Sequence, residues 1–445
     1  MKVVVFGTGP WPTEPGAVVT SPAIRTRIFV EPLQAAKHDV VLILLEDQRR
    51  SKVPVPRALA AEAFAPDDIL NPAALSAALD LSFTGAVFGV GSLMPNVAAC
   101  RLAKHLGCPA WVDFNGDPLA ELHAAQLRQG GKPDITTRDH IWKLTREALL
   151  SGDAFSTVSG PQRHAVLGQL GLLGRYVDHW DVCQRVSEIP NGVPPAWAEP
   201  IEVPPFPKVL SDAGFKPGDR YVLFTGSWNV WLDEATMGRA LAIALEQEPS
   251  LKVVISGIPT GPAGQEVRRT FLEAIAPAVA AGRVLECPPL GADAENALLA
   301  HAGTCFSLDR AIPESELGAR NRLHNMVRWG TRPVVSIEAE IERVIVAEGL
   351  AAGVEGADPQ RAAREVLRAC ARSASEREED RQNALQWMRT VTYARVMTPA
   401  IAWLAAGPKP WPAAPAGGLL DQWAGLPADP EILFPTAKKR RSWFS

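Results

Sequence analysis

Short apolar runs alternate with stretches of helical periodicity along the first half of the chain. This alternation predicts a parallel sheet covered by helices on both faces, because parallel strands are joined by helical crossovers. The expected strands are Lys2 to Phe6, Val40 to Leu45, Gly85 to Gly89, Pro109 to Phe114 and Ala154 to Ser159. The expected helices include Ala73 to Leu81, Val97 to Leu106 and Asp139 to Leu150.

The same alternation restarts after a proline-dense stretch, which predicts a second α/β domain. Its expected strands are Arg220 to Thr225, Lys252 to Ser256, Val284 to Cys287, Gly303 to Ser307 and Pro333 to Ser336. Its expected helices are Glu234 to Gln247, Gly264 to Val279, Glu295 to His301 and Arg320 to Trp329. The expected fold class is therefore α/β, with two doubly wound domains.

Proline, glycine and helical segments mark the expected boundaries. Asn191-Gly192 follows a strand ending in Ile189-Pro190, and this dipeptide predicts a tight turn that tolerates positive φ. The proline-dense stretch cannot join a central strand and predicts an extended linker. The expected units are a first domain over 1–190, a hinge and linker over 191–207, a second domain over 208–382, a helix over 383–406 and a Pro- and Gly-rich tail over 407–445.

Composition limits the classes of partner. A formal net charge of -4 gives no overall attraction for nucleic acid, so none is expected as a partner. The 6 cysteines lie singly, without paired metal spacing, and predict reduced core thiols in a cytoplasmic protein. No apolar run reaches membrane-spanning length. The patch 438–444 joins basic and aromatic residues, which suits peripheral contact with the inner face of a membrane; a solubilising tail is the alternative.

Two segments carry a family resemblance. Ile189-Pro190-Asn191-Gly192-Val193 resembles the segment that joins the two halves of GT-B glycosyltransferases, particularly the retaining glycosyltransferase family 4 (glycosyl transferases group 1). The stretch from Asp309 to Val335 resembles that family's acidic loop, helix and following strand. The resemblance implies two Rossmann-like domains that face a cleft, with a C-terminal helix that recrosses to the first domain.

The first domain carries the residues expected on the acceptor side. The resemblance implies that Gly9, in the loop after the first strand, faces the donor and that Arg25 lies near the acceptor or the phosphates. Asp113, Asn115 and Asp117 follow an expected strand, at the edge where doubly wound sheets bind ligands. Asp113 is a candidate to orient acceptor hydroxyls or act as a base, with a turn as the alternative. Helix capping is favoured for Asp117, and Asn115 stands where many relatives place a histidine.

The strand from Arg220 to Thr225 leads into Gly226-Ser227, which resembles the donor-phosphate segment of the family. Gly226 permits close backbone approach, and Ser227 can donate to a phosphate. The Arg and Lys that relatives carry here are absent. Trp228 and Trp231 either stack on a base or sugar or simply pack against the strand.

A later segment is expected to supply the missing charge. Members of the family carry two glutamates eight residues apart in this segment. Glu316 lies near the first, and the resemblance implies that it contacts the donor sugar and has a catalytic role. Asn325 stands at the second, which implies contact with the ribose. Gly318 and Arg320 at an expected helix start predict an anion site made of backbone N–H groups, the helix dipole and a guanidinium. Arg320 and Arg322 are the expected diphosphate ligands, with Arg320 as a catalytic group; an exposed amphipathic helix is the alternative.

Together these residues predict a glycosyltransferase that moves a sugar from a nucleoside diphosphate sugar to an acceptor hydroxyl with retention. The acceptor would be a glycan, a lipid-linked glycan or a protein, in polysaccharide or cell-envelope synthesis, the family's commonest theme. No tightly bound cofactor is expected, and no histidine group or Asp-x-Asp pair predicts a metal. Two alternatives stay open: a catalytically silent GT-B protein that binds a glycan or partner, and a nucleotide-sugar epimerase.

Overall fold

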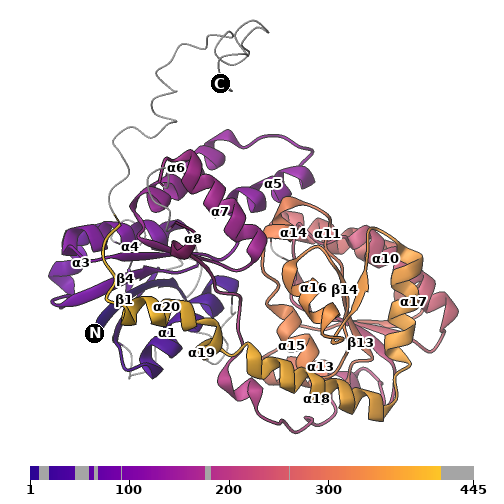
Figure 1. The fold of residues 1–445 in the computed structure, drawn as a ribbon. Helices are drawn as coiled ribbons and strands as arrows, with labels where there is room; N and C mark the ends of the chain where they lie inside the picture. Colours follow the sequence, from indigo (N-terminus) through magenta and orange to yellow (C-terminus); the bar gives the residue numbers. More distant parts are fainter. Residues whose placement is uncertain are drawn as a thin grey trace, which may run out of the picture.

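Two parallel sheets flanked by helices make up the molecule (Figure 1). The computed structural model describes residues 1–9, 20–45, 60–64, 69–91, 93–175, 182–259 and 261–411. The expected α/β class with two Rossmann-like domains is confirmed, since every strand pair in the two large sheets is parallel. The patch 438–444 lies outside the described residues.

The first sheet has the strand order β3-β2-β1-β4-β5-β6-β7. Its strands are β1 (Lys2–Thr8), β2 (Asp39–Leu45), β3 (Ala60–Phe64), β4 (Thr84–Gly89), β5 (Ala110–Phe114), β6 (Ala154–Thr157) and β7 (Val186–Glu188). Its helices are α1 (Ser21–Ala35), α3 (Pro72–Ala78), α4 (Leu93–Leu106), α5 (Pro118–Arg128), α6 (Ile135–Ser151), α7 (Gly160–Leu172) and α8 (Val182–Arg185).

The alternation of side chains along β1 explains why its sequence is continuously apolar. Val4 and Phe6 point into the core beneath α4 and α6, whereas Val3 and Val5 point into the core beneath α1 and the C-terminal helices. Successive residues of a strand face opposite sides of the sheet, so a strand buried on both faces needs apolar residues at every position.

The second sheet has the order β12-β10-β8-β13-β14-β15. Its strands are β8 (Tyr221–Phe224), β10 (Lys252–Ile255), β12 (Val284–Glu286), β13 (Thr304–Ser307), β14 (Val334–Ser336) and β15 (Ala352–Val354), beside a small pair β9 (Ser227–Trp228) and β11 (Ile258–Pro259). Its helices are α9 (Lys208–Asp212), α10 (Glu234–Gln247), α11 (Gly261–Ala274), α12 (Ala276–Ala280), α13 (Ala292–His301), α14 (Pro313–Leu317), α15 (Arg322–Arg328), α16 (Glu340–Ala347) and α17 (Pro359–Cys370), and a 3-10 turn covers Pro195–Ala198.

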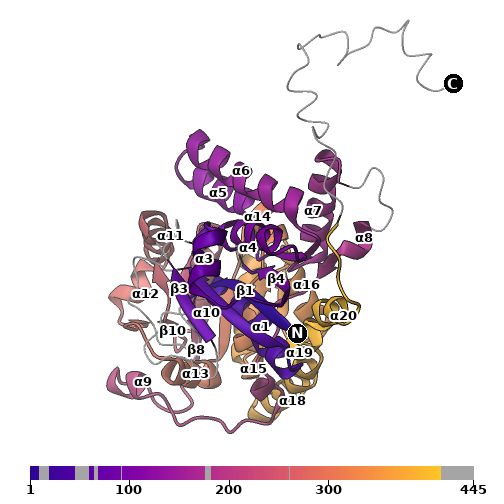
Figure 2. The ribbon, with the colours of Figure 1, turned by 90° about the vertical axis from the view of Figure 1, so that its left-hand side faces the viewer.

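The chain crosses between the domains twice, and the two crossings lie side by side. The return path comprises α18 (Ala374–Thr390), α19 (Tyr393–Val396) and α20 (Thr398–Ala405), which run from the second domain to the first in Figure 1; Figure 2 shows α19 and α20 close to α1. The Tyr393 amide donates to the carbonyl of Val193 at 2.9 Å, and the Val193 amide donates to that of Val391 at 2.9 Å. The expected recrossing to the first domain is confirmed, with Trp403 of α20 packed edge-on against Trp111 of β5.

The hinge glycine differs from its expectation. Gly192 does not adopt a positive φ. A Cβ at this position would instead lie 2.8 Å from the carbonyl oxygen of Val391, so the close approach of the two crossings excludes a side chain.

The structure also bears on the expectations for the cysteines and for membrane-spanning segments. Cys100, Cys305 and Cys370 are buried, but Cys183 is exposed, so the expectation that all cysteines are core thiols is wrong for that residue. Among the described residues, no helix combines the length and apolar character that a membrane crossing requires.

Candidate functional site

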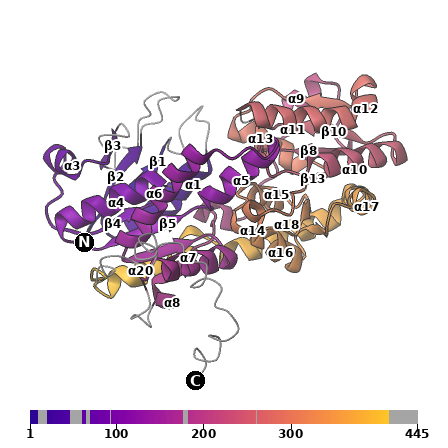
Figure 3. The same ribbon diagram turned by 90° about the horizontal axis from the view of Figure 1, so that it is seen from above.

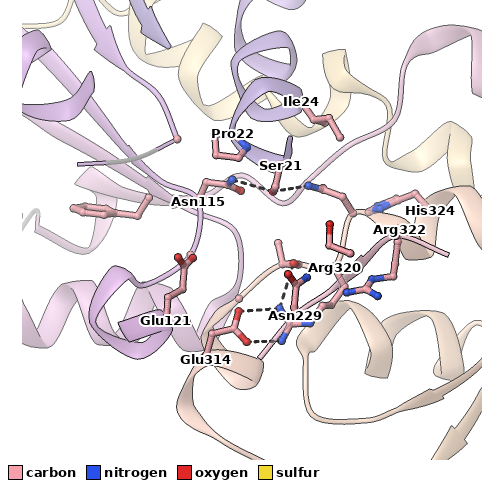
Figure 4. Close-up of a pocket in the computed structure, with 18 of the residues that line it drawn as sticks. Ser21, Pro22, Ile24, Asn115, Glu121, Asn229, Glu314, Arg320, Arg322 and His324 are labelled. Carbon is pink, nitrogen blue, oxygen red and sulfur yellow. Dashed lines mark hydrogen bonds and ion pairs between the residues drawn. The ribbon is translucent and has the colours of Figure 1, made fainter. Parts of the chain in front are cut away.

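The two domains enclose a cavity of about 970 Å³ at the carboxyl ends of their strands, the edge where open parallel sheets bind ligands. The start of α1, the loop between β5 and α5, and α5 itself form its first wall. The loop after β8, α13 and the chain between β13 and α15 form the second. Figure 3 shows α5 and α14 at the junction of the domains, and Figure 4 shows side chains from both walls converging.

Gly226 and Arg322 lie against each other on the second-domain wall. Gly226 has a φ of 94°, and an added Cβ would lie 3.6 Å from Nη1 of Arg322. That nitrogen is buried and has no hydrogen-bond partner within the described part of the chain. Burial also lowers the pKa of Arg322, because its charge is poorly solvated. A buried cation with an unused donor is suited to receive an anionic group, and Ser227 lines the cavity beside it.

Arg320 has different surroundings from those expected. Its side chain is 3% exposed and donates to the carboxylate of Asp309 and, at 2.8 Å, to Oε2 of Glu314. Burial by itself would lower the pKa of Arg320, but the two carboxylates outweigh it and raise that pKa. Arg320 reaches the cavity wall with its charge already balanced, and its guanidinium also lies over the ring of Trp231, 5.2 Å from the ring centroid.

The acidic residue of this segment that lines the cavity is also not the one expected. Glu314 is buried and lines the cavity, whereas Glu316 is exposed and lies outside the lining. Gly318 ends α14, and a Cβ on it would lie 2.6 Å from Nη1 of Arg320, so this glycine makes room for the ion pair. The helix start expected at Gly318 and Arg320 is wrong. The helix α15 begins at Arg322 instead. Asn325 of α15 lines the cavity.

On the first domain, Asp113 and Arg25 bind each other instead of facing the cavity. Both side chains are 0% exposed, and Arg25 donates twice to Asp113, at 2.9 and 2.7 Å. Arg25 also reaches Oδ1 of Asn191 at 3.2 Å, and Ser156 donates to Asp113 at 2.6 Å. Neither residue belongs to the cavity lining. The pair ties β5, α1 and the hinge together behind the cavity.

The loop after β5 contains one lining residue and one cap. Asn115 lines the cavity and donates to Oγ of Ser21 at 3.2 Å. Asp117 accepts from the amides of Leu119 and Ala120 at 2.9 Å each, which is the helix cap favoured from the sequence. Asp117 and Gly9 lie outside the cavity lining.

Several lining residues escaped the sequence prediction. Glu121 stands one helical turn after the Asp117 cap and faces the cavity, as Figure 4 shows; that spacing is the signal that could have found it. Its side chain is exposed to solvent in the cleft, and partial desolvation, with the nearby carboxylates of Glu314 and Asp117, raises its pKa to about 7. Asn229 and Glu295 also line the cavity, and only the folded chain brings them there.

His324 is a buried lining residue whose ring stacks on Trp387, with the ring centroids 5.4 Å apart. Burial lowers the pKa of His324 to about 4, so the imidazole is neutral at physiological pH.

Buried polar atoms without a partner gather around the cavity. Within the described ranges, lining atoms of this kind are Oδ1 of Asn115, Nε1 of Trp231, Nη1 of Arg322, Nε2 of His324 and Oδ1 of Asn325. Buried polar groups are normally hydrogen-bonded, so unpartnered ones that converge on a cavity indicate a site for a polar ligand. No group of three or more metal-binding side chains occurs among the residues that the structure describes.

Comparison with known proteins finds matches in structure but none in sequence. No protein-family model and no curated protein matches this sequence. Sucrose-phosphate synthase of Thermosynechococcus elongatus matches in structure with a TM-score of 0.61 at 14% identity, over 91% of this chain and 99% of that one. Anabaena HepE in complex with UDP matches with a TM-score of 0.64 at 12% identity, over 91% and 100% of the two chains.

A UDP-forming α,α-trehalose-phosphate synthase of Burkholderia xenovorans, in complex with glucose-6-phosphate, gives a TM-score of 0.61 at 13% identity over 91% of this chain and 99% of that one. At such identities the likeness establishes the fold. The chain has the GT-B architecture, with two Rossmann-like domains facing a cleft. The GT-B part of the resemblance seen in the sequence is thus confirmed; its narrower assignment to family 4 is not established by these structures.

Proposed function

We propose that the protein is a glycosyltransferase that moves a sugar from a nucleoside diphosphate sugar to an acceptor hydroxyl. The GT-B fold and a cavity between the two domains support this function. Its structural neighbours include HepE, solved with UDP and glucose, and a UDP-forming trehalose-phosphate synthase. Fold alone does not determine activity, so the proposal rests on the site.

The observation that carries the proposal is the unpartnered, buried guanidinium nitrogen of Arg322 lying against Gly226. The leaving group of the reaction is a nucleoside diphosphate. Arg322 can offer it a charge-assisted hydrogen bond, while Gly226 lets a phosphate approach the backbone and Ser227 adds a hydroxyl donor.

The reaction follows from that placement. The bond between the anomeric carbon and the diphosphate oxygen breaks, and its electron pair passes to the diphosphate. The acceptor oxygen forms the new bond to the same carbon and loses its proton to the diphosphate or a nearby carboxylate. A fixed cation at the leaving oxygen is worth about 3 kcal/mol in the transition state. We assign this task to Arg322 and propose a reaction that needs no metal ion.

Other residues of the cavity are assigned by their placement. Asn325 is the proposed ribose contact, and Asn115 the proposed contact on the acceptor side, since both carry unpartnered buried oxygens. Arg320 is a positioning residue, because its ion pairs hold the acidic segment against the cavity. The Arg25–Asp113 pair positions the loop that carries Asn115. Retention, and a role in cell-envelope polysaccharide synthesis, rest on the family 4 resemblance.

One alternative has a specific observation in its favour, and a second would use the same donor cavity. A catalytically silent GT-B protein is favoured by the balanced charge of Arg320, which leaves less free positive charge than a diphosphate site of two arginines. A nucleotide-sugar epimerase needs the same donor cavity and no acceptor.

Product analysis by mass spectrometry and anomeric NMR separates these functions. The purified protein is incubated with UDP-, GDP-, dTDP- and ADP-sugars, with and without a mixture of saccharide acceptors. A glycosylated acceptor and one released nucleoside diphosphate support the proposal, and an axial or equatorial product bond reports the stereochemistry. A changed sugar still attached to its nucleotide indicates the epimerase, and unchanged donors throughout indicate the silent protein.

A further inference from the structure

The acceptor wall of the cavity differs in character from the donor wall. Apolar residues from three elements line it: Phe114 at the end of β5, which is largely buried in the domain core, Leu122 of α5 and Ile141 of α6. A surface of this kind stabilises a ligand through contact with its apolar face.

Positive charge on this wall is already used. Within the described lining of the first domain, the sole cationic side chain is Arg27, which pairs with Glu31 at 2.5 Å and lies over the ring of Tyr393. The unused guanidinium nitrogen of Arg322 belongs to the opposite wall, where the proposed diphosphate binds. A phosphate on the acceptor would therefore find no free cation on the acceptor side.

Negative charge, by contrast, faces the acceptor space. Glu121 projects from α5 into the cavity (Figure 4), and a second carboxylate, that of Glu314 of α14, lines the cavity but is paired with Arg320. Gly116 leaves room for the first of these carboxylates, since a Cβ there would lie 2.9 Å from Oε1 of Glu121. A carboxylate accepts hydrogen bonds from hydroxyl groups and repels a phosphate.

We propose that the acceptor is an uncharged, hydroxyl-bearing molecule with an apolar portion, such as a glycoside, whose hydroxyl donates to Glu121. This specificity rests on the proposed transferase function and differs from that suggested by the neighbour solved with glucose-6-phosphate. The apolar portion would lie against Phe114, Leu122 and Ile141.

Binding of matched probes tests the inference without any donor. Ligand-observed NMR would compare neutral monosaccharides, their octyl glycosides below the micelle concentration, and their 6-phosphates. We expect each octyl glycoside to bind more tightly than its parent sugar, and each 6-phosphate to bind more weakly. Glu121→Gln should weaken the neutral probes about tenfold, the loss expected for one hydrogen bond to a charged group. Glu246→Gln, on the exposed face of α10, removes the same charge outside the cavity and should change nothing.

A 6-phosphate that binds more tightly than its neutral partner would overturn the inference, as would neutral binding that Glu121→Gln leaves unchanged. The donor assay distinguishes this failure from that of the transferase proposal. Release of nucleoside diphosphate with transfer to a phosphorylated sugar would retain the activity and reject the acceptor class.

Discussion

Arg320 and Arg322 are close neighbours in the sequence, yet their guanidinium groups have different surroundings. Arg320 is enclosed by two carboxylates, whereas Arg322 keeps a buried nitrogen without a partner in the described structure. The sequence predicts both as phosphate ligands, because nothing in the local pattern shows that Asp309 and Glu314 fold back onto the first of them. The distinction depends on the loop between β13 and α15.

Removing the Arg320 side chain should destabilise the second domain. Arg320→Gln leaves the buried carboxylates of Asp309 and Glu314 without their cation, and breaking such a pair costs about 3–5 kcal/mol. Thermal and urea unfolding would measure the loss. Arg368→Gln on α17 breaks an exposed pair with Glu365 and should cost less than about 1 kcal/mol. Equal stability of the two variants would show that the buried pairs contribute nothing.

The pH dependence of acceptor use should report on Glu121. Its pKa is raised to about 7 by partial desolvation in the cleft and by Glu314 and Asp117, against the opposing effect of Arg320, so the accepting carboxylate form prevails only above that pH. Acceptor affinity should therefore rise as the pH increases through about 7, and Glu121→Gln should abolish that rise. The measurement is the acceptor Kd or KM from pH 5.5 to 8.5 in both proteins. A rise that persists in the variant would assign the titration to another group.

Single residues show how far the sequence could predict the site. The Asp117 cap follows from local chemistry and is found as favoured. The pairing of Asp113 with Arg25 joins residues far apart in the chain, and no local spacing indicates it. Glu314 lines the cavity where Glu316 was expected. Which side chains a short helix turns toward a cavity depends on how the helix packs, and the sequence does not show this.

At the scale of elements, the apolar alternation predicts the central strands because they are buried on both faces. The edge strands β3 and β15 were not expected. Ala60 to Phe64 is rich in alanine, and Ala352 to Val354 is short and contains glycine, so neither has the β-branched composition typical of strands. The return helix was expected to be continuous, but it breaks between α18 and α19, where Tyr393 bonds to the hinge at Val193.

One element contact couples the domains directly. Arg128, in the last turn of α5, pairs with Glu234 of the second domain and donates to the carbonyl of Val230 at 2.9 Å. These partners belong to residues 229–234, the segment that brings Asn229 and Trp231 into the cavity. The contact thus joins the first domain to a segment that shapes the donor wall.

Arg128→Ala should loosen this segment. Without the charge-assisted bonds, amide hydrogen exchange across residues 229–234 should become faster, and the KM for the donor should rise about tenfold while the fold stays intact. Mass-spectrometric exchange would measure the first effect and initial rates the second. Arg138→Ala is the matched control, because Arg138 pairs only with its exposed neighbour Asp139 among the described residues. Identical exchange in the two variants would argue against the coupling.

For the whole molecule, two Rossmann-like domains place a buried cation and a set of unpartnered polar atoms at one shared cavity. We infer that a nucleoside diphosphate binds against Gly226 and Arg322. A ligand that binds the folded state alone raises its stability by about 2.7 kcal/mol at one hundred times its Kd.

The most direct measurement is the thermal unfolding of the wild type and of Arg322→Gln with UDP, GDP, dTDP and ADP. We expect a rise in Tm of several degrees with one of these nucleotides in the wild type. We also expect that Arg322→Gln, with a near-normal Tm by itself, loses most of that rise. No rise with any nucleotide at millimolar concentration, or an equal rise in the variant, would contradict the assignment of the donor site.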